Sequence, residues 1–149
     1  MTEDIAATTA APGQSEATGR RGTADYVQVR MPAEGAYLSV LRTAAAGLAA
    51  RLDFTLDEIE DLRIAIDEAC AMLLSEAIPG TDLECVFELG NEQVTITVSV
   101  VAAQPRMPSR ETFAWTVLSA LAGTVDSRLG PDDRVSIVLA KRRGASGSG

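Results

Sequence analysis

The 149-residue sequence contains no histidine and only one lysine, Lys141. Without histidine, a Ser-His or Cys-His nucleophile pair, phosphohistidine chemistry and nearly every type of zinc site are excluded. Lys141 lies near the C-terminus, and no glycine-rich loop precedes it, so the chain offers no residue for a P-loop or a Schiff-base mechanism. These absences argue against a hydrolase or a metalloenzyme.

Basic residues, cysteines and long apolar runs are also scarce. The 13 Lys and Arg residues against 21 Asp and Glu residues give a formal net charge of −8, which repels nucleic acids and anionic membranes. No apolar run reaches the ~18–20 residues of a bilayer span, and nothing near Met1 has the form of a signal peptide. Cys70 and Cys85 are spaced for neither a redox CxxC pair nor a metal site. We therefore expect a cytoplasmic protein that binds neither nucleic acid nor membranes, with two free thiols.

The composition predicts one folded domain between two flexible ends. Its 46% hydrophobic and 23% charged residues are typical of one globular domain of about 150 residues. Residues 1–23 are rich in Ala, Thr, Gly and Ser and carry little apolar area, which predicts a disordered tail. Residues 143–149, which end in GASGSG, predict a second flexible tail. The folded domain is expected over 24–142.

Alternation of apolar and polar residues predicts four strands. They are expected at about 24–31, 82–89, 93–101 and 135–139. Gly90-Asn91 provides a hairpin turn between the two middle strands, which should therefore pair antiparallel.

Helical spacing of apolar residues predicts three helices. The first is expected at about 36–51. The second should begin at the capping-box pair Thr55 and Glu58 and end before Pro79-Gly80, and the third should run from Trp115 to Leu129. The resulting order β-α-α-β-β-α-β predicts the α+β class, as a two-layer sandwich with helices on one face of the sheet.

The stretch from Met31 to Leu74 is the most distinctive part of the sequence. It reads M-P-A-E-x-x-Y-L-x-V-L-R, followed by L-D-F-T-L-D-E-I-E-D-L-R-I-A-I-D-E-A-C. These motifs resemble those of the RsbW/SpoIIAB anti-sigma factors, the serine-kinase-like members of the GHKL (histidine-kinase-like ATPase) fold. The resemblance is strong over 29–74 and weaker afterwards. The later segment T-F-A-W-T-V-L-S-A-L-A-x-x-V is most similar to the divergent actinobacterial UsfX-like branch of that family.

The resemblance implies a protein that sequesters an alternative stress or developmental sigma factor of RNA polymerase. A STAS-type anti-anti-sigma antagonist would release the sigma factor, and family members resemble homodimers. Typical members also phosphorylate a serine of the antagonist with ATP and Mg²⁺. Arg42 matches a basic position on the first helix through which the family grips its sigma factor, whereas a solvated surface arginine is the alternative interpretation.

The family's nucleotide site is degraded in this sequence. Glu68 matches the general-base glutamate, but Met72 stands at the position of the Mg-binding asparagine, and its side chain has no oxygen for a hard cation. Residues 100–105, VVAAQP, contain neither the Asp nor the Gly residues of the adenine-reading loop. Residues 111–115, ETFAW, place bulky rings where a glycine-rich lid would approach phosphate. We therefore expect a vestigial Glu68, no kinase activity, and no cofactor or metal.

Two other functions stay open at this stage. One is an active ATP-dependent serine kinase in which other groups replace the missing motifs. The other is a small-ligand sensor with a pocket between the sheet and the third helix. Among individual residues, Asp67 is expected to pair with Arg63, and Arg42 is expected to be largely exposed. Phe113 and Trp115 are expected in the core or filling the vacated pocket.

Overall fold

The computed structural model describes residues 16–21 and 24–144. Its strands are β1 (Glu16–Arg21), β2 (Ala24–Pro32), β3 (Asp82–Leu89), β4 (Gln93–Val101), β5 (Thr124–Leu129) and β6 (Arg134–Arg142). Its helices are α2 (Leu38–Arg51), which follows the 3-10 turn η1 (Gly35–Tyr37), α3 (Leu56–Leu74) and α4 (Phe113–Leu121).

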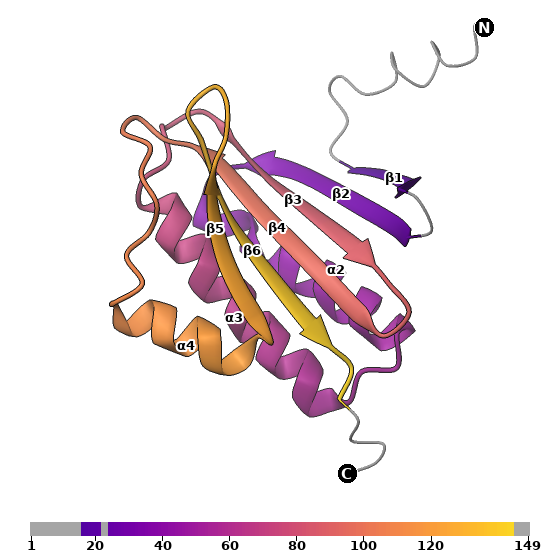
Figure 1. Cartoon of the computed structure of the whole chain (residues 1–149). Helices are drawn as coiled ribbons and strands as arrows, with labels where there is room; N and C mark the ends of the chain where they lie inside the picture. The colour runs from indigo at the N-terminus through magenta and orange to yellow at the C-terminus, as the bar shows by residue number, and fades with distance from the viewer. Residues whose placement is uncertain (1–15, 22–23, 145–149) are drawn as a thin grey trace, which may run out of the picture.

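Over the described part of the chain, the strands form one antiparallel sheet in the order β1-β2-β3-β4-β6-β5. The helices lie on one side of this sheet, and in Figure 1 the sheet lies in front of α2 and α3. Helix α3 is the central helix, because it packs against α2, α4 and the strands β4 and β6. The prediction of an α+β two-layer sandwich is confirmed.

The predicted order of elements differs from the structure at two places, because β1 precedes β2 and β5 follows α4. Val125 and Leu129 were expected on the third helix, but that helix ends at Leu121, and Thr124–Leu129 forms the edge strand β5. Val125 and Leu129 are four residues apart, and residues at this separation lie on the same face of a helix and also on the same face of a strand. The backbone of Gly123 lies against β6, since a Cβ atom added there would be 2.8 Å from the carbonyl oxygen of Ala140.

Described residues from both segments that were predicted to be tails make structured contacts. Residues 16–21 of the expected N-terminal tail form β1, which pairs antiparallel with β2; residues 1–15 and 22–23 lie outside the described residues. At the other end, the Arg143 guanidinium makes ion pairs with Asp53 (3.8 Å) and Glu92 (3.0 Å). The backbone N–H of Gly144 donates to Glu58 Oε2 (2.7 Å), and residues 145–149 are not described. The structured contacts therefore include residues 16–21 and 143–144, outside the predicted domain bounds of 24–142.

Helix α3 begins at the predicted capping box. The Thr55 hydroxyl accepts a hydrogen bond from the Glu58 backbone N–H (3.1 Å), and the Thr55 N–H donates to Glu58 Oε1 (2.8 Å). The hydrogen bond from the Thr55 N–H is the largest influence on Glu58 and lowers the pKa of its carboxyl, and the N–H of Gly144 acts in the same direction. The charged form of Glu58 therefore stabilises the start of α3 and also binds the backbone of Gly144, just after β6.

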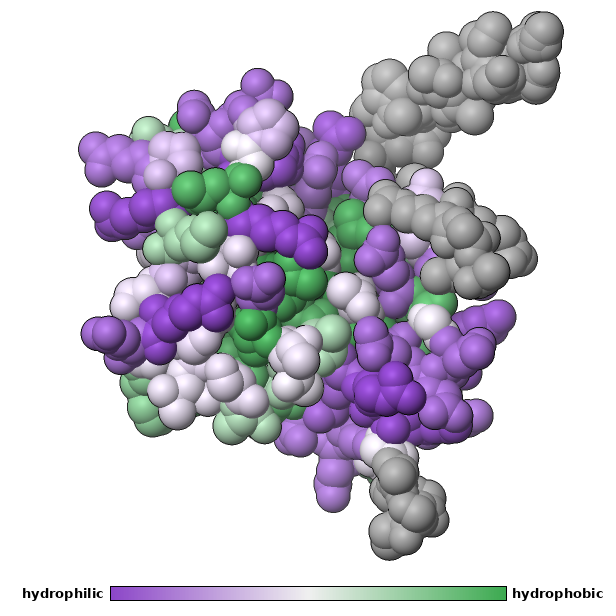
Figure 2. Space-filling view, viewed as in Figure 1, coloured by the Kyte–Doolittle hydropathy of each residue, from purple (hydrophilic) through white to green (hydrophobic). Residues whose placement is uncertain are grey.

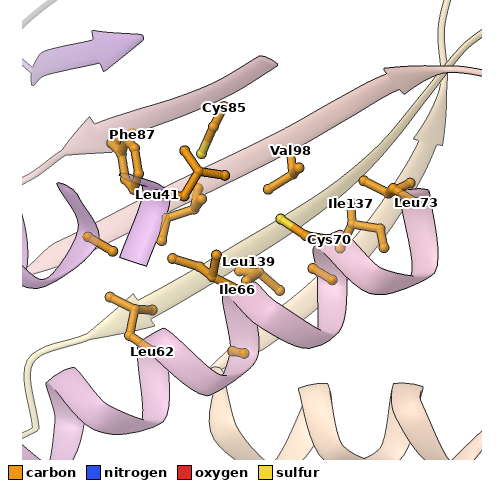
Figure 3. Packing of buried hydrophobic residues seen from close by; sticks show 14 of the residues in the cluster. Leu41, Leu62, Ile66, Cys70, Leu73, Cys85, Phe87, Val98, Ile137 and Leu139 are labelled. Atoms are coloured by element: carbon orange, nitrogen blue, oxygen red, sulfur yellow. The ribbon is translucent and has the colours of Figure 1, made fainter. Parts of the chain in front are cut away.

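The core lies between α3 and the sheet (Figure 3). Its fully buried members in that view are Leu41, Leu62, Ile66, Cys70, Leu73, Cys85, Phe87, Val98, Ile137 and Leu139. Both cysteines are free thiols, and burial raises the pKa of Cys70 to about 12 and that of Cys85 well above its ordinary value. They act as small apolar core residues, and their thiolates are suppressed at neutral pH.

The middle of the other face of the sheet carries small and β-branched residues, and Arg30 and Arg134 make ion pairs with Glu84 on the same face. Val86, Thr97 and Val138 are cross-strand neighbours on this face, and Ser99 and Ser136 beside them share a buried hydrogen bond between their hydroxyls (2.7 Å). Figure 2 shows apolar and near-neutral residues over the middle of the sheet, surrounded by hydrophilic ones. Among the described helices, none is long and apolar enough to cross a membrane.

Candidate functional site

A cavity of about 310 Å³ lies at the C-terminal end of α3, which we call the α3 cavity. Its lining comes mainly from the last turn of α3 and from residues 102–112, which connect β4 to α4 and which we call the β4–α4 loop. Its lining is Met72, Leu73, Ser75, Glu76, Ala102, Gln104, Arg106, Met107, Pro108, Ser109, Thr112, Ala114 and Val135. The volume is at the lower end of the range of small-molecule sites.

The α3 cavity brings together positions that the sequence resemblance assigned to nucleotide binding. Met72 (the magnesium-ligand position), Ala102 and Gln104 (the adenine-loop segment) and Thr112 (the lid segment) all line it. Apart from Glu76, which makes an ion pair with Arg106 (3.8 Å), no lining residue carries a carboxylate. The thioether of Met72 has no oxygen for Mg²⁺, so the residue at the magnesium-ligand position does not fit the family's Mg-ATP site.

Glu68 lies one helical turn before Met72 but is not part of the cavity lining. Its side chain is partly buried and makes no hydrogen bond or ion pair with any described residue. The described residues also contain no group of three or more His, Cys, Asp or Glu side chains that could hold a metal ion.

The β4–α4 loop is held against the edge of the sheet by Arg110, a residue that the sequence analysis missed. Its guanidinium lies over the Trp115 ring (4.7 Å to the ring centroid) and donates to Asp126 Oδ1 (3.0 Å) and Ser127 Oγ (3.4 Å). A backbone hydrogen bond from Ser127 and the contact with Arg110 lower the pKa of Asp126. The chain therefore supplies its own contacts to position this loop.

The two aromatic residues at the start of α4 behave differently. Trp115 is buried in the core, as expected. Phe113 is 81% exposed, so the prediction that it would be buried is wrong, and neither ring lines the α3 cavity. The Thr112 hydroxyl caps this helix by accepting from the Trp115 N–H (3.1 Å).

Arg42 forms an ion pair across the seam between α2 and α3. Its Nη1 donates to Asp67 Oδ1 at 2.8 Å, and the two side chains are 32% and 41% exposed. The expected pairing of Asp67 with Arg63 is wrong, because Arg63 contacts Glu60 instead (3.5 Å). The prediction of a largely exposed Arg42 is also wrong, because the side of α2 that carries Arg42 faces α3. Arg42 and Asp67 are 25 residues apart, so their contact could not be found from local spacing in the sequence.

Comparisons with known proteins find relatives in sequence and in fold. The anti-sigma-F factor RsbW of Mycobacterium tuberculosis is 32% identical over 135 residues, which cover 86% of this chain and 80% of that protein. The serine-protein kinase RsbW of Bacillus subtilis is 40% identical over 57 residues, and the chain spans 36% of its length. A crystal structure of the RsbU and RsbW domains of a Mycobacterium tuberculosis protein matches with a TM-score of 0.59 at 15% identity, over 83% of this chain and 34% of that one. No protein-family model matches.

The α+β sandwich defines the class: a domain with the GHKL-like fold of RsbW proteins. Within this class, the extent of the mycobacterial match decides the assignment. The chain belongs to the RsbW family of anti-sigma factors.

Proposed function

We propose that this protein is an anti-sigma factor, which binds an alternative sigma factor of RNA polymerase and keeps it from the polymerase. The observation that carries this proposal is the similarity, along 86% of the chain, to the anti-sigma-F factor RsbW of Mycobacterium tuberculosis. A STAS-domain antagonist releases the sigma factor by competing for the anti-sigma factor. Both partners are cytoplasmic, and so is this protein.

The mode of action we propose is stoichiometric binding without phosphoryl transfer. Met72 at the magnesium position, in a cavity with one carboxylate in its lining, supports this. The second candidate function is an active ATP- and Mg²⁺-dependent serine kinase that phosphorylates the antagonist. It is supported by the partial match to the Bacillus subtilis kinase and by the carboxylate of Glu68 at the general-base position.

The binding surface we propose includes Arg42 on α2. Its guanidinium is partly exposed and uses one N–H for Asp67, which leaves donors for a carboxylate of the sigma factor. Truncating a desolvated charge at an interface costs about 2–5 kcal/mol of binding free energy. Arg42→Glu should therefore weaken sigma binding at least about tenfold.

We also propose that the protein is a homodimer. The apolar middle of the open sheet face, around Val86 and Val138, supports a second copy as its partner. Light scattering during gel filtration tests this directly, and a monomeric mass at micromolar concentration would contradict it.

The central experiment is titration calorimetry of the purified full chain against each purified alternative sigma factor of the source organism, with the housekeeping sigma factor as the control. We expect one alternative sigma factor to bind tightly and the housekeeping factor not to bind. Binding to none of the alternative sigma factors would contradict the proposed function.

A thermal melt with Mg-ATP separates the binding protein from the kinase. A ligand at 100 times its Kd stabilises a protein by about 2.7 kcal/mol, which for 149 residues raises the melting temperature by roughly 5–10 °C. We expect no such shift and no transfer of phosphate to a STAS-domain substrate. Transfer that Glu68→Ala abolishes would establish the kinase instead.

A further inference from the structure

The Arg42–Asp67 ion pair suggests a role for a residue that the family resemblance leaves without one. We propose that Asp67 is a positioning residue for partner binding: it holds the Arg42 guanidinium in place so that its remaining donors meet a carboxylate of the sigma factor. This inference rests on the proposed function and on Arg42 being part of the binding surface.

The geometry favours a fixed guanidinium. The contact between Arg42 Nη1 and Asp67 Oδ1 is 2.8 Å long, which is typical of a charge-assisted hydrogen bond. It joins two helices that pack against each other, so neither end of the contact is on a mobile loop. A guanidinium has five N–H donors in a rigid fork, and only one of Arg42's is used within the described part of the chain.

A free arginine side chain would lose conformational freedom when a partner immobilises it, and this lowers affinity. Asp67 removes much of that freedom before the partner arrives. Because the other N–H donors of Arg42 are not used within the described part of the chain, and the two side chains are 32% and 41% exposed, the guanidinium can still donate to a second carboxylate.

The surroundings of the ion pair leave room for a partner. One turn away on α2 are Ser39, which is exposed, and Ala46, which is partly exposed. On α3, Ala71 is exposed and Ile64 is 39% exposed, and both lie one turn from Asp67. These small and apolar neighbours fit a helix or loop of the sigma factor that carries an acidic residue beside an apolar one.

The test uses titration calorimetry of full-chain variants against the sigma factor that binds in the experiment above. Immobilising one such side chain corresponds to roughly a two- to tenfold change in affinity, so we expect Asp67→Ala to weaken binding by that factor. In an Arg42→Ala background, Asp67→Ala should have no further effect. Asp61→Asn is the matched control, since Asp61 is on the same helix, makes no contact with Arg42, and its loss should leave the affinity unchanged.

A second measurement needs no partner. The ¹⁵N relaxation of the Arg42 Nε–H in the free protein should show a lower order parameter in Asp67→Ala than in the wild type. An unchanged order parameter would overturn the inference, as would unchanged or tighter sigma binding by Asp67→Ala, or further weakening in the Arg42→Ala background. If instead Arg42→Ala binds like the wild type, the proposed binding surface fails, and the role of Asp67 with it.

Discussion

Substituting Gly123 distinguishes the observed strand β5 from the helix that the sequence pattern predicts. In the structure, an added Cβ would lie 2.8 Å from the Ala140 carbonyl oxygen and 3.7 Å from Lys141 Cα. Both are backbone atoms of β6, so relief requires the two strands to separate locally. Overpacking of this kind costs about 1–3 kcal/mol. If Gly123 were inside a helix, Gly123→Ala would instead stabilise the protein by about 1 kcal/mol.

Gly47 is the matched control for this substitution. It lies inside α2, and an added Cβ would meet no atom within 4 Å. Gly47→Ala should therefore stabilise the protein by about 0.4–1 kcal/mol. Urea unfolding gives the free energy of unfolding of both variants and the wild type. Equal stabilisation by the two substitutions would refute the reasoning and restore a helix over 122–129.

Three further perturbations test the core, the thiols and the capping box. Leu41 is fully buried, and Leu41→Ala should lower the free energy of unfolding by about 2–5 kcal/mol, measured with urea. Because the pKa of Cys70 is raised to about 12, the thiol ionises above pH 9 in the unfolded chain but not in the folded one, so the free energy of unfolding should fall as the pH rises above 9. Urea unfolding at pH 7 and pH 10 measures this fall, which should be smaller in Cys70→Ala than in the wild type. The pKa of Glu58 is lowered, so its carboxylate stabilises the folded protein above pH 4.5, and this contribution is lost as the pH falls through the pKa of the folded state. The difference in free energy of unfolding between the wild type and Glu58→Gln should therefore shrink from pH 7 to pH 3.

Local signals in the sequence were sufficient for most elements. The Thr55 and Glu58 capping box is made by neighbouring residues, and the structure has it at the start of α3. The alternation in 82–89 and 93–101 likewise predicted β3, β4 and their antiparallel pairing correctly. These features depend on period and on short-range hydrogen bonds, which a single sequence contains.

Features that depend on distant contacts could not be predicted in this way. The segment 124–129 is a strand because β6 supplies hydrogen-bond partners, and its own apolar spacing does not decide between helix and strand. In the candidate site, the resemblance assigned Met72 and the adenine-loop segment, but only the fold brings them to one cavity. Asp67 pairs with Arg42 because α2 and α3 are adjacent, although Arg63 is nearer in sequence.

The contacts of Arg110 have a consequence for how the cell could regulate this protein. Trp115 and Asp126 belong to the chain itself, so the contacts that hold this loop through Arg110 need no phosphate. Under the proposed mode of action, which is binding without ATP, the affinity of each molecule for its sigma factor therefore does not depend on the nucleotide concentration. The amount of active sigma factor is then set by the numbers of the competing proteins, so that gene expression responds to synthesis and turnover of the antagonist and not to the energy state of the cell.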